Sequence, residues 1–169
     1  LPTLATRWPG QAVATGGSTA DDGLNLIELA RLYLREDNLK SAEKTLRYIE
    51  ATKALIPAGL VDEVWGDIHL ENKRFEKAEA AYSRALEGVA KSVRHRNRDA
   101  RLRFQHGLAV RALGRHSEAA VALRQGIDGG GAPRGPQGWL RLLESTLIVA
   151  SKPKDYEEAL EICAKAEQG

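Results

Sequence analysis

Apolar and small residues recur with helical spacing between residues 64 and 86. Four of them lie at i, i+3, i+7 and i+10 and so share one face of a helix with 3.6 residues per turn: Phe75, Ala78, Tyr82 and Ala85. The segment before them carries Trp65, Gly66 and His69 on one stripe, and a polar run separates the two. The pattern predicts two amphipathic helices that pack as a hairpin, with Gly66 and Ala78 allowing the backbones to approach closely.

The same kind of small-residue pair occurs three times along the chain. In each pair the second residue follows the first by twelve positions: Ala30 and Ala42, Gly66 and Ala78, and Gly107 and Ala119. Successive pairs are 36 and 41 residues apart, and such recurrence is typical of stacked helical hairpins. Because a single hairpin leaves one apolar face uncovered, stability is expected to come from stacking on its neighbours.

These positions resemble the tetratricopeptide repeat (TPR) family, whose pattern is W-x2-L-G-x2-Y followed by A-x3-F over a period of about 34 residues. The first repeat of this chain carries that pattern as follows: Leu26-x2-Leu29-Ala30-x2-Tyr33, then Ala42-x3-Leu46. The resemblance implies an all-α fold, a right-handed α-solenoid of stacked antiparallel helix hairpins with about three to four TPR-like repeats. The fourth repeat is weaker, since Trp139 suits its first helix only if about one extra turn precedes the bend.

Clusters of glycine and proline divide the chain into segments. An irregular N-terminal segment is expected over residues 1–22, followed by the TPR-like repeat domain over 23–169. The repeats are expected near four ranges: 23–58, 59–99, 100–128 and 139–169. The glycine-rich run 128–138 between the last two is expected to be a flexible connector.

Composition narrows the class of protein. Hydrophobic residues make up 43% and charged residues 28% of the 169 residues, which is ordinary for a globular protein, and a net charge of +2 is too small to attract nucleic acid by bulk charge alone. Cys163 is the single cysteine and is expected to be a buried thiol of the last helix. No apolar run reaches the ~18 residues of a membrane span and no signal peptide is visible, so a cytoplasmic protein is expected. The chain lacks methionine and starts at Leu1, so we interpret it as a fragment whose parent could still be exported.

Motifs that carry catalysis are missing from the sequence. The glycine-rich run contains neither GxxxxGK[ST] nor GxGxxG, the histidines show no HExxH spacing, and no serine lies in GxSxG. His69 occupies the position of the family's tyrosine, where packing with a polar tip is expected rather than metal binding. We therefore expect no enzyme, no cofactor and no metal site.

A basic stretch lies between residues 91 and 103. Six of its residues carry a positive charge: Lys91, Arg94, Arg96, Arg98, Arg101 and Arg103. A solvated junction between helices explains the stretch without any function. The alternative is a docking strip for an acidic partner or a phosphate backbone, although the lack of interleaved aromatic residues argues against RNA recognition.

In the TPR family the first helices of successive hairpins line a concave groove that holds a peptide. The resemblance places nine residues there, three before, one after and four after each small residue: Ile27, Arg31, Leu34, Glu63, Asp67, Leu70, Phe104, Leu108 and Arg111. Five of the nine are apolar, more than a solvated face would carry, so the groove is a candidate partner-binding surface unless another element of the chain covers it. One TPR subset clamps a C-terminal carboxylate from matching positions, but Glu63 and Asp67 would repel that ligand.

The expected function is that of a scaffold or adaptor that binds a protein or peptide partner in this groove. The alternatives are a regulatory or sensing module of a larger enzyme or transcription regulator, and binding of an acidic partner or nucleic acid through residues 91–103. The N-terminal segment adds a further hypothesis. Leu4 and Trp8 would dock on an apolar face, either capping the first hairpin or entering a groove of this copy or another, the latter giving self-association.

Overall fold

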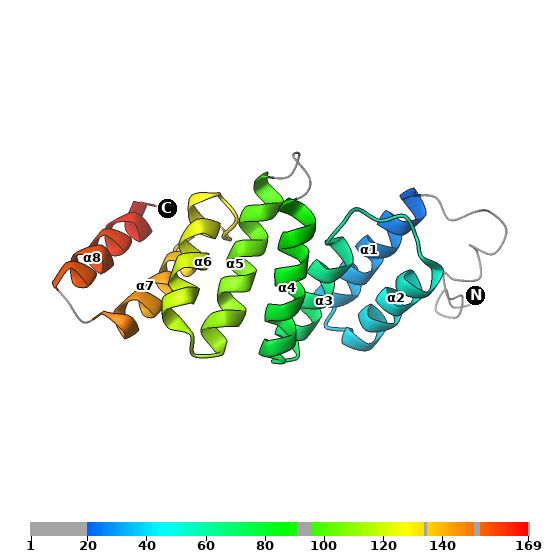
Figure 1. The fold of residues 1–169 in the computed structure, drawn as a ribbon, viewed down its shortest axis with the longest axis horizontal. Coiled ribbons are helices and arrows are strands. Elements are labelled where there is room, and N and C mark those ends of the chain that lie inside the picture. Colours follow the sequence, from blue (N-terminus) through cyan, green and yellow to red (C-terminus); the bar gives the residue numbers. More distant parts are fainter. Residues whose placement is uncertain (1–19, 91–95, 134, 151–152, 169) are drawn as a thin grey trace, which may run out of the picture. The chain divides into compact units, whose positions relative to one another are not determined.

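The computed structural model describes residues 20–90, 96–133, 135–150 and 153–168, and every regular element in these ranges is an α-helix (Figure 1). The helices run as follows: α1 Ala20–Arg35, α2 Leu39–Thr52, α3 Leu60–Glu71, α4 Phe75–Ala90, α5 Arg96–Ala112, α6 His116–Asp128, α7 Gln137–Val149 and α8 Pro153–Gln168. The all-α prediction is therefore confirmed.

The chain divides into two compact units. The N-terminal unit, Leu1–Pro57, contains the hairpin of α1 and α2, and the C-terminal unit, Ala58–Gly169, contains the six other helices. In the N-terminal unit, the side chains of Ile27, Leu46 and Ile49 are buried. Helix α1 begins at Ala20, so residues 20–22, expected to be irregular, belong to the helix.

Helices of the C-terminal unit pack in chain order. Each helix from α3 to α8 contacts the next one (Figure 1), and α3 also touches α5, so the first helices of the second and third hairpins meet. One core cluster joins α4 to α5 through Tyr82, Val89 and Leu102. A second core cluster joins helices α5 to α8 through one buried residue from each: Phe104, Leu123, Leu142 and Ile162. Stacking of hairpins over a shared core is the arrangement of a helical-repeat solenoid.

Glycines in α3 and α5 allow the close approach within each hairpin. A Cβ atom at Gly66 would lie 2.5 Å from Tyr82 Cε1, and one at Gly107 would lie 2.9 Å from Leu123 Cγ. The side chain nearest to Gly66 is therefore the ring of Tyr82, whereas the sequence pattern had suggested Ala78. The ring fills the space because Tyr82 lies one turn beyond Ala78 on the same face of α4.

The bends of three hairpins share one backbone conformation. Asp37, Lys73 and Gly114 all have positive φ angles, of 56°, 55° and 78°, and are spaced by the repeat period. In each bend the following N–H donates to the carbonyl five residues earlier, for example Asn38 to Tyr33 at 2.8 Å and Arg74 to His69 at 2.8 Å. This is the Schellman ending of a helix, which reverses the chain within a few residues.

Two segments expected to connect helices are partly helical or packed. Helix α5 begins at Arg96, so residues 96–103 of the basic stretch are helical, and residues 91–95 lie outside the described residues. The glycine-rich run is held against α5, because a Cβ atom at Gly129 would lie 2.5 Å from Ala100 Cβ and one at Gly131 would lie 2.1 Å from the Ala100 carbonyl carbon. Such close packing tolerates no side chain and does not fit a flexible connector. Cys163, expected to be buried, is half-buried beside the buried Ile162.

Candidate functional site

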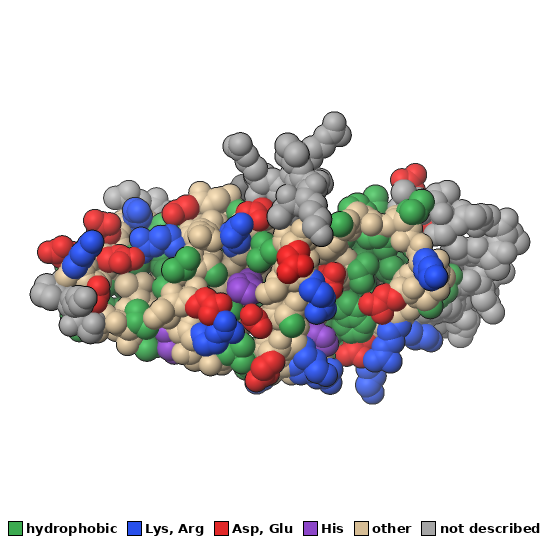
Figure 2. Space-filling view, viewed as in Figure 1, with side chains coloured by type: hydrophobic (Ala, Val, Ile, Leu, Met, Phe, Trp, Pro, Cys, Tyr) green, Lys and Arg blue, Asp and Glu red, His purple; other side chains and the backbone are tan. Residues whose placement is uncertain are grey.

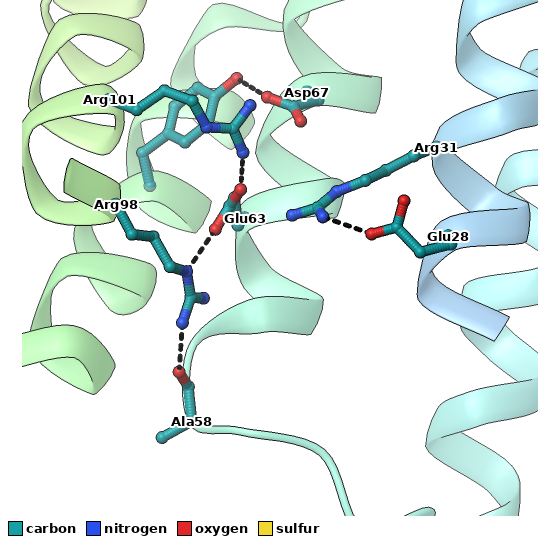
Figure 3. Close-up of polar contacts among 8 residues, drawn as sticks. Glu28, Arg31, Ala58, Glu63, Asp67, Arg98 and Arg101 are labelled. Atoms are coloured by element: carbon teal, nitrogen blue, oxygen red, sulfur yellow. Dashed lines mark hydrogen bonds and ion pairs between the residues drawn. The ribbon is translucent and has the colours of Figure 1, made fainter. Parts of the chain in front are cut away.

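Helix α3 presents Glu63, Asp67 and Leu70 along one face. Glu63 is 1% exposed. Its Oε2 accepts a 2.6 Å hydrogen bond from Arg98 Nε, and its Oε1 pairs with Arg101 of the same helix α5 (Figure 3). Arg98 also donates through Nη1 to the carbonyl oxygen of Ala58 at 3.4 Å. Two guanidinium groups thus bind one buried carboxylate, and the cluster ties the start of α5 to α3.

A second contact ties α3 to α4. The phenol of Tyr82 donates a 2.7 Å hydrogen bond to Asp67 Oδ1 (Figure 3). Burial raises the pKa of the Tyr82 phenol well above its ordinary value of 10.0, and the charge and hydrogen bond of Asp67 add to that increase. Tyr82 is therefore a neutral donor at any physiological pH, and Asp67 is oriented by it while staying partly exposed.

His106 of α5 faces α4. Its Nε2 shares a 3.3 Å hydrogen bond with Ser83 Oγ and lies 3.7 Å from Glu79 Oε1. Burial lowers the pKa of His106 below its ordinary value of 6.5, while the carboxylates of Glu79 and Glu118 oppose the shift and Arg115 reinforces it. The neutral imidazole consequently fits this interface between two hairpins.

Arg111 of α5 and Arg141 of α7 meet at a single carboxylate. Glu144 Oε2 lies 2.9 Å from Arg111 Nη1 and 3.3 Å from Arg141 Nη1. Arg141 and Glu144 were not among the predicted site residues, because no groove positions were assigned to the fourth repeat. A signal was available, since this pair at i and i+3 supplies the only charged residues of the stretch 139–149.

The nine predicted groove residues fall into two groups. Ile27, Glu63 and Phe104, each three positions before the small residue of its helix, are buried and do not offer their side chains to a partner. The six others are partly exposed: Arg31, Leu34, Asp67, Leu70, Leu108 and Arg111. Within the N-terminal unit, Arg31 pairs with Glu28 at 2.7 Å (Figure 3). Phe104 is buried because it belongs to the core cluster around Leu123 and Leu142.

The described arginines of the basic stretch are engaged within the protein. Arg98 and Arg101 pair with Glu63, and Arg103 pairs with Asp99 at 2.8 Å and with Gln125 at 3.0 Å. Lys91 and Arg94 lie outside the described residues, as does the side chain of Arg96. Figure 2 shows basic and acidic side chains interspersed over the visible face of the described residues. The described part of the stretch therefore offers little unpaired charge for an acidic partner.

The remaining predictions concern His69, metal binding, membrane crossing and the N-terminal segment. His69 stacks on Trp65, with ring centroids 5.5 Å apart, which agrees with a packing role. Across the described ranges there is no group of three or more His, Cys, Asp or Glu residues placed to hold a metal ion. None of the described helices has the length and apolarity that a membrane crossing needs. Leu4 and Trp8 lie outside the described residues, so their docking stays a prediction.

Comparison with known proteins identifies the class. The family model described as a tetratricopeptide repeat-like domain matches residues 10–105, which is more than half of the chain. No curated protein matches the chain. The chain therefore belongs to the tetratricopeptide repeat-like family, whose helical repeats commonly serve as protein-interaction modules and are typically not catalytic.

Proposed function

We propose that this chain is a non-catalytic adaptor that binds a protein or peptide partner through the first helices of its hairpins. The proposal assigns the binding face in the C-terminal unit to α3 and α5. The observation that carries the proposal is that both helices show the same pattern of buried and exposed positions around their glycines. The residue three before each glycine is buried, whereas the residues one and four after it stay partly exposed: Asp67 and Leu70 on α3, Leu108 and Arg111 on α5.

The exposed positions combine properties that suit a peptide ligand. Leu70 and Leu108 are partly buried apolar side chains. Leu70 packs against the core cluster that contains Tyr82, and Leu108 packs against the one that contains Phe104. Asp67 and Arg111 supply one charge of each sign beside them. Because the buried ion pairs of Glu63 and the Tyr82 hydrogen bond hold α3 against its neighbours, the face is preorganised and its ordering adds little cost on binding.

Partner capture with matched variants tests the proposal. The chain carrying Leu70→Ser and Leu108→Ser should lose its specific partners, while Val121→Ser, an exposed apolar position on α6, should retain them. Circular dichroism and melting temperature must show that both variants stay folded. Equal loss in both variants, or retention in the double variant, would contradict the assignment of the face.

A further inference from the structure

Two arginines from different helices share one oxygen of Glu144. The side chains are 27%, 48% and 44% exposed for Arg111, Glu144 and Arg141 respectively, so solvent reaches the cluster. The Oε2 atom of Glu144 accepts from both guanidinium groups. Two positive charges against one negative charge leave the cluster with an excess positive charge.

Arg111 retains hydrogen-bonding capacity after it has bound Glu144. Glu144 contacts its Nη1, and the Nε of Arg111 is buried with no hydrogen-bond partner among the described residues. A guanidinium group prefers to bind a carboxylate through two parallel N–H donors. A second carboxylate, or one that replaces Glu144, would therefore complete a bonding pattern that Glu144 satisfies only in part.

The contact with Glu144 is weak enough to exchange. Salt bridges between exposed side chains contribute little because each charge is well hydrated when it is released. By contrast, the carboxylate of Glu63 is almost fully buried, and its arginines cannot release it without a large cost. Among these two arginine clusters, the one at Glu144 is thus suited to ligand exchange.

Apolar side chains lie on the same side of α7. Arg141, Glu144 and Ile148 are at i, i+3 and i+7 and share one face, and Ile148 is 60% exposed. Leu140 and Leu147 lie beside this face and are also exposed. These three exposed aliphatic residues lie next to a cluster with excess positive charge, and together they complement a segment that carries both aliphatic and acidic side chains.

We infer that Arg111 and Arg141 form a carboxylate-binding subsite for an acidic, aliphatic peptide segment of a partner protein, and that Glu144 holds this subsite until the partner's carboxylate takes its place. The inference rests on the proposed adaptor function and extends its face from α3 and α5 to α7. The aliphatic side chains of the segment pack on Ile148 and its neighbours, and no covalent step is involved.

A peptide library displayed on phage and selected on the whole chain provides the probe. Enriched peptides should combine an Asp or Glu with at least two aliphatic residues. Binding of one such peptide should weaken at least tenfold with Arg111→Gln and with Arg141→Gln. Glu144→Gln should instead tighten binding about two- to fivefold, because it removes the internal competitor. Glu118→Gln is the matched control and should change nothing, since Glu118 of α6 forms an exposed i, i+3 pair with Arg115, the residue before that helix.

Each other outcome overturns a defined part of the account. Peptides that bind equally well to Arg111→Gln but lose binding with Leu70→Ser and Leu108→Ser would refute this subsite and leave the adaptor function intact. If no peptide is enriched and no partner is captured, both fail. A dimer in sedimentation experiments that Ile148→Glu dissociates would show that a second copy, not a partner protein, covers α7.

Discussion

Glu63 and Arg98 lie 35 residues apart in the sequence and form a 2.6 Å ion pair in which the carboxylate is almost completely shielded from water. The pair joins α3 of the second hairpin to the first turn of α5, which is the first helix of the third hairpin. Arg101 from the next turn of α5 shares the same carboxylate. The stacking of the second hairpin on the third thus depends on a polar cluster as well as on apolar packing.

Removal of the Glu63 carboxylate should destabilise the protein strongly. We expect Glu63→Ala to lower the free energy of unfolding by about 3–5 kcal/mol, because it leaves two arginines without their buried counter-charge. Asp62→Ala is the control, since its pair with Arg84 is exposed and should contribute no more than about 1 kcal/mol. Urea unfolding compares the two. Equal losses would mean that the cluster has no special role.

The contact between Gly66 and the Tyr82 ring should tolerate no added carbon atom. Gly66→Ala places a Cβ atom 2.5 Å from Tyr82 Cε1 and should cost about 1–3 kcal/mol of stability. The loss should shrink when Tyr82 is replaced by Leu in the same protein, since the ring no longer blocks the site. A double-mutant cycle measures this coupling, and additive losses would contradict the packing described for this hairpin.

The left-handed bend at Lys73 offers a stabilising substitution. Lys73 has φ 55°, a conformation that costs a residue with a Cβ atom about 1–2 kcal/mol. Lys73→Gly should therefore raise the free energy of unfolding by about 0.5–1 kcal/mol. This value already includes the opposing effect of glycine, which increases the conformational entropy of the unfolded chain. Gly114→Lys, at the equivalent bend, should lower it, as should Lys77→Gly inside α4. Chemical denaturation of the three variants gives the signs.

Stability should fall as His106 is forced to take up a proton. Because burial places its pKa in the folded protein below the ordinary value of 6.5, the unfolded state binds the proton first. The contribution of the neutral ring is complete above pH 6.5 and is lost as the pH falls below that value toward the pKa of the folded state. His106→Gln should make the free energy of unfolding depend less on pH between pH 7.5 and 5. The difference between the wild-type and variant profiles gives the contribution of His106. Parallel profiles would show that Glu79 and Glu118 compensate for the burial.

The sequence predicted the hairpins well because their signals are local. Helical periodicity and the small residues at Gly66 and Gly107 depend on residues within one hairpin, so the pattern alone identifies them. The bend between Glu71 and Phe75 was predicted as well, but the left-handed conformation of Lys73 within it was not, since a lysine in that conformation is rare.

Contacts between hairpins could not be predicted in the same way. The start of α5 at Arg96 is stabilised by Glu63 of another hairpin. The close approach of Gly131 to Ala100 depends on tertiary packing between residues that are distant in the sequence. The burial of Phe104 and Ile27 likewise follows from packing, whereas the family resemblance placed them in a groove. Arg141 and Glu144 were missed because the fourth repeat departs from the twelve-residue spacing of the others.

The central claim, that the first helices of the hairpins carry the partner-binding face, is tested most directly by site-specific photo-crosslinking. A photoreactive phenylalanine analogue placed at Leu108 should crosslink to the captured partner, and the same analogue at Val121 on α6 should not. Crosslinking from Val121 with none from Leu108 would contradict the claim.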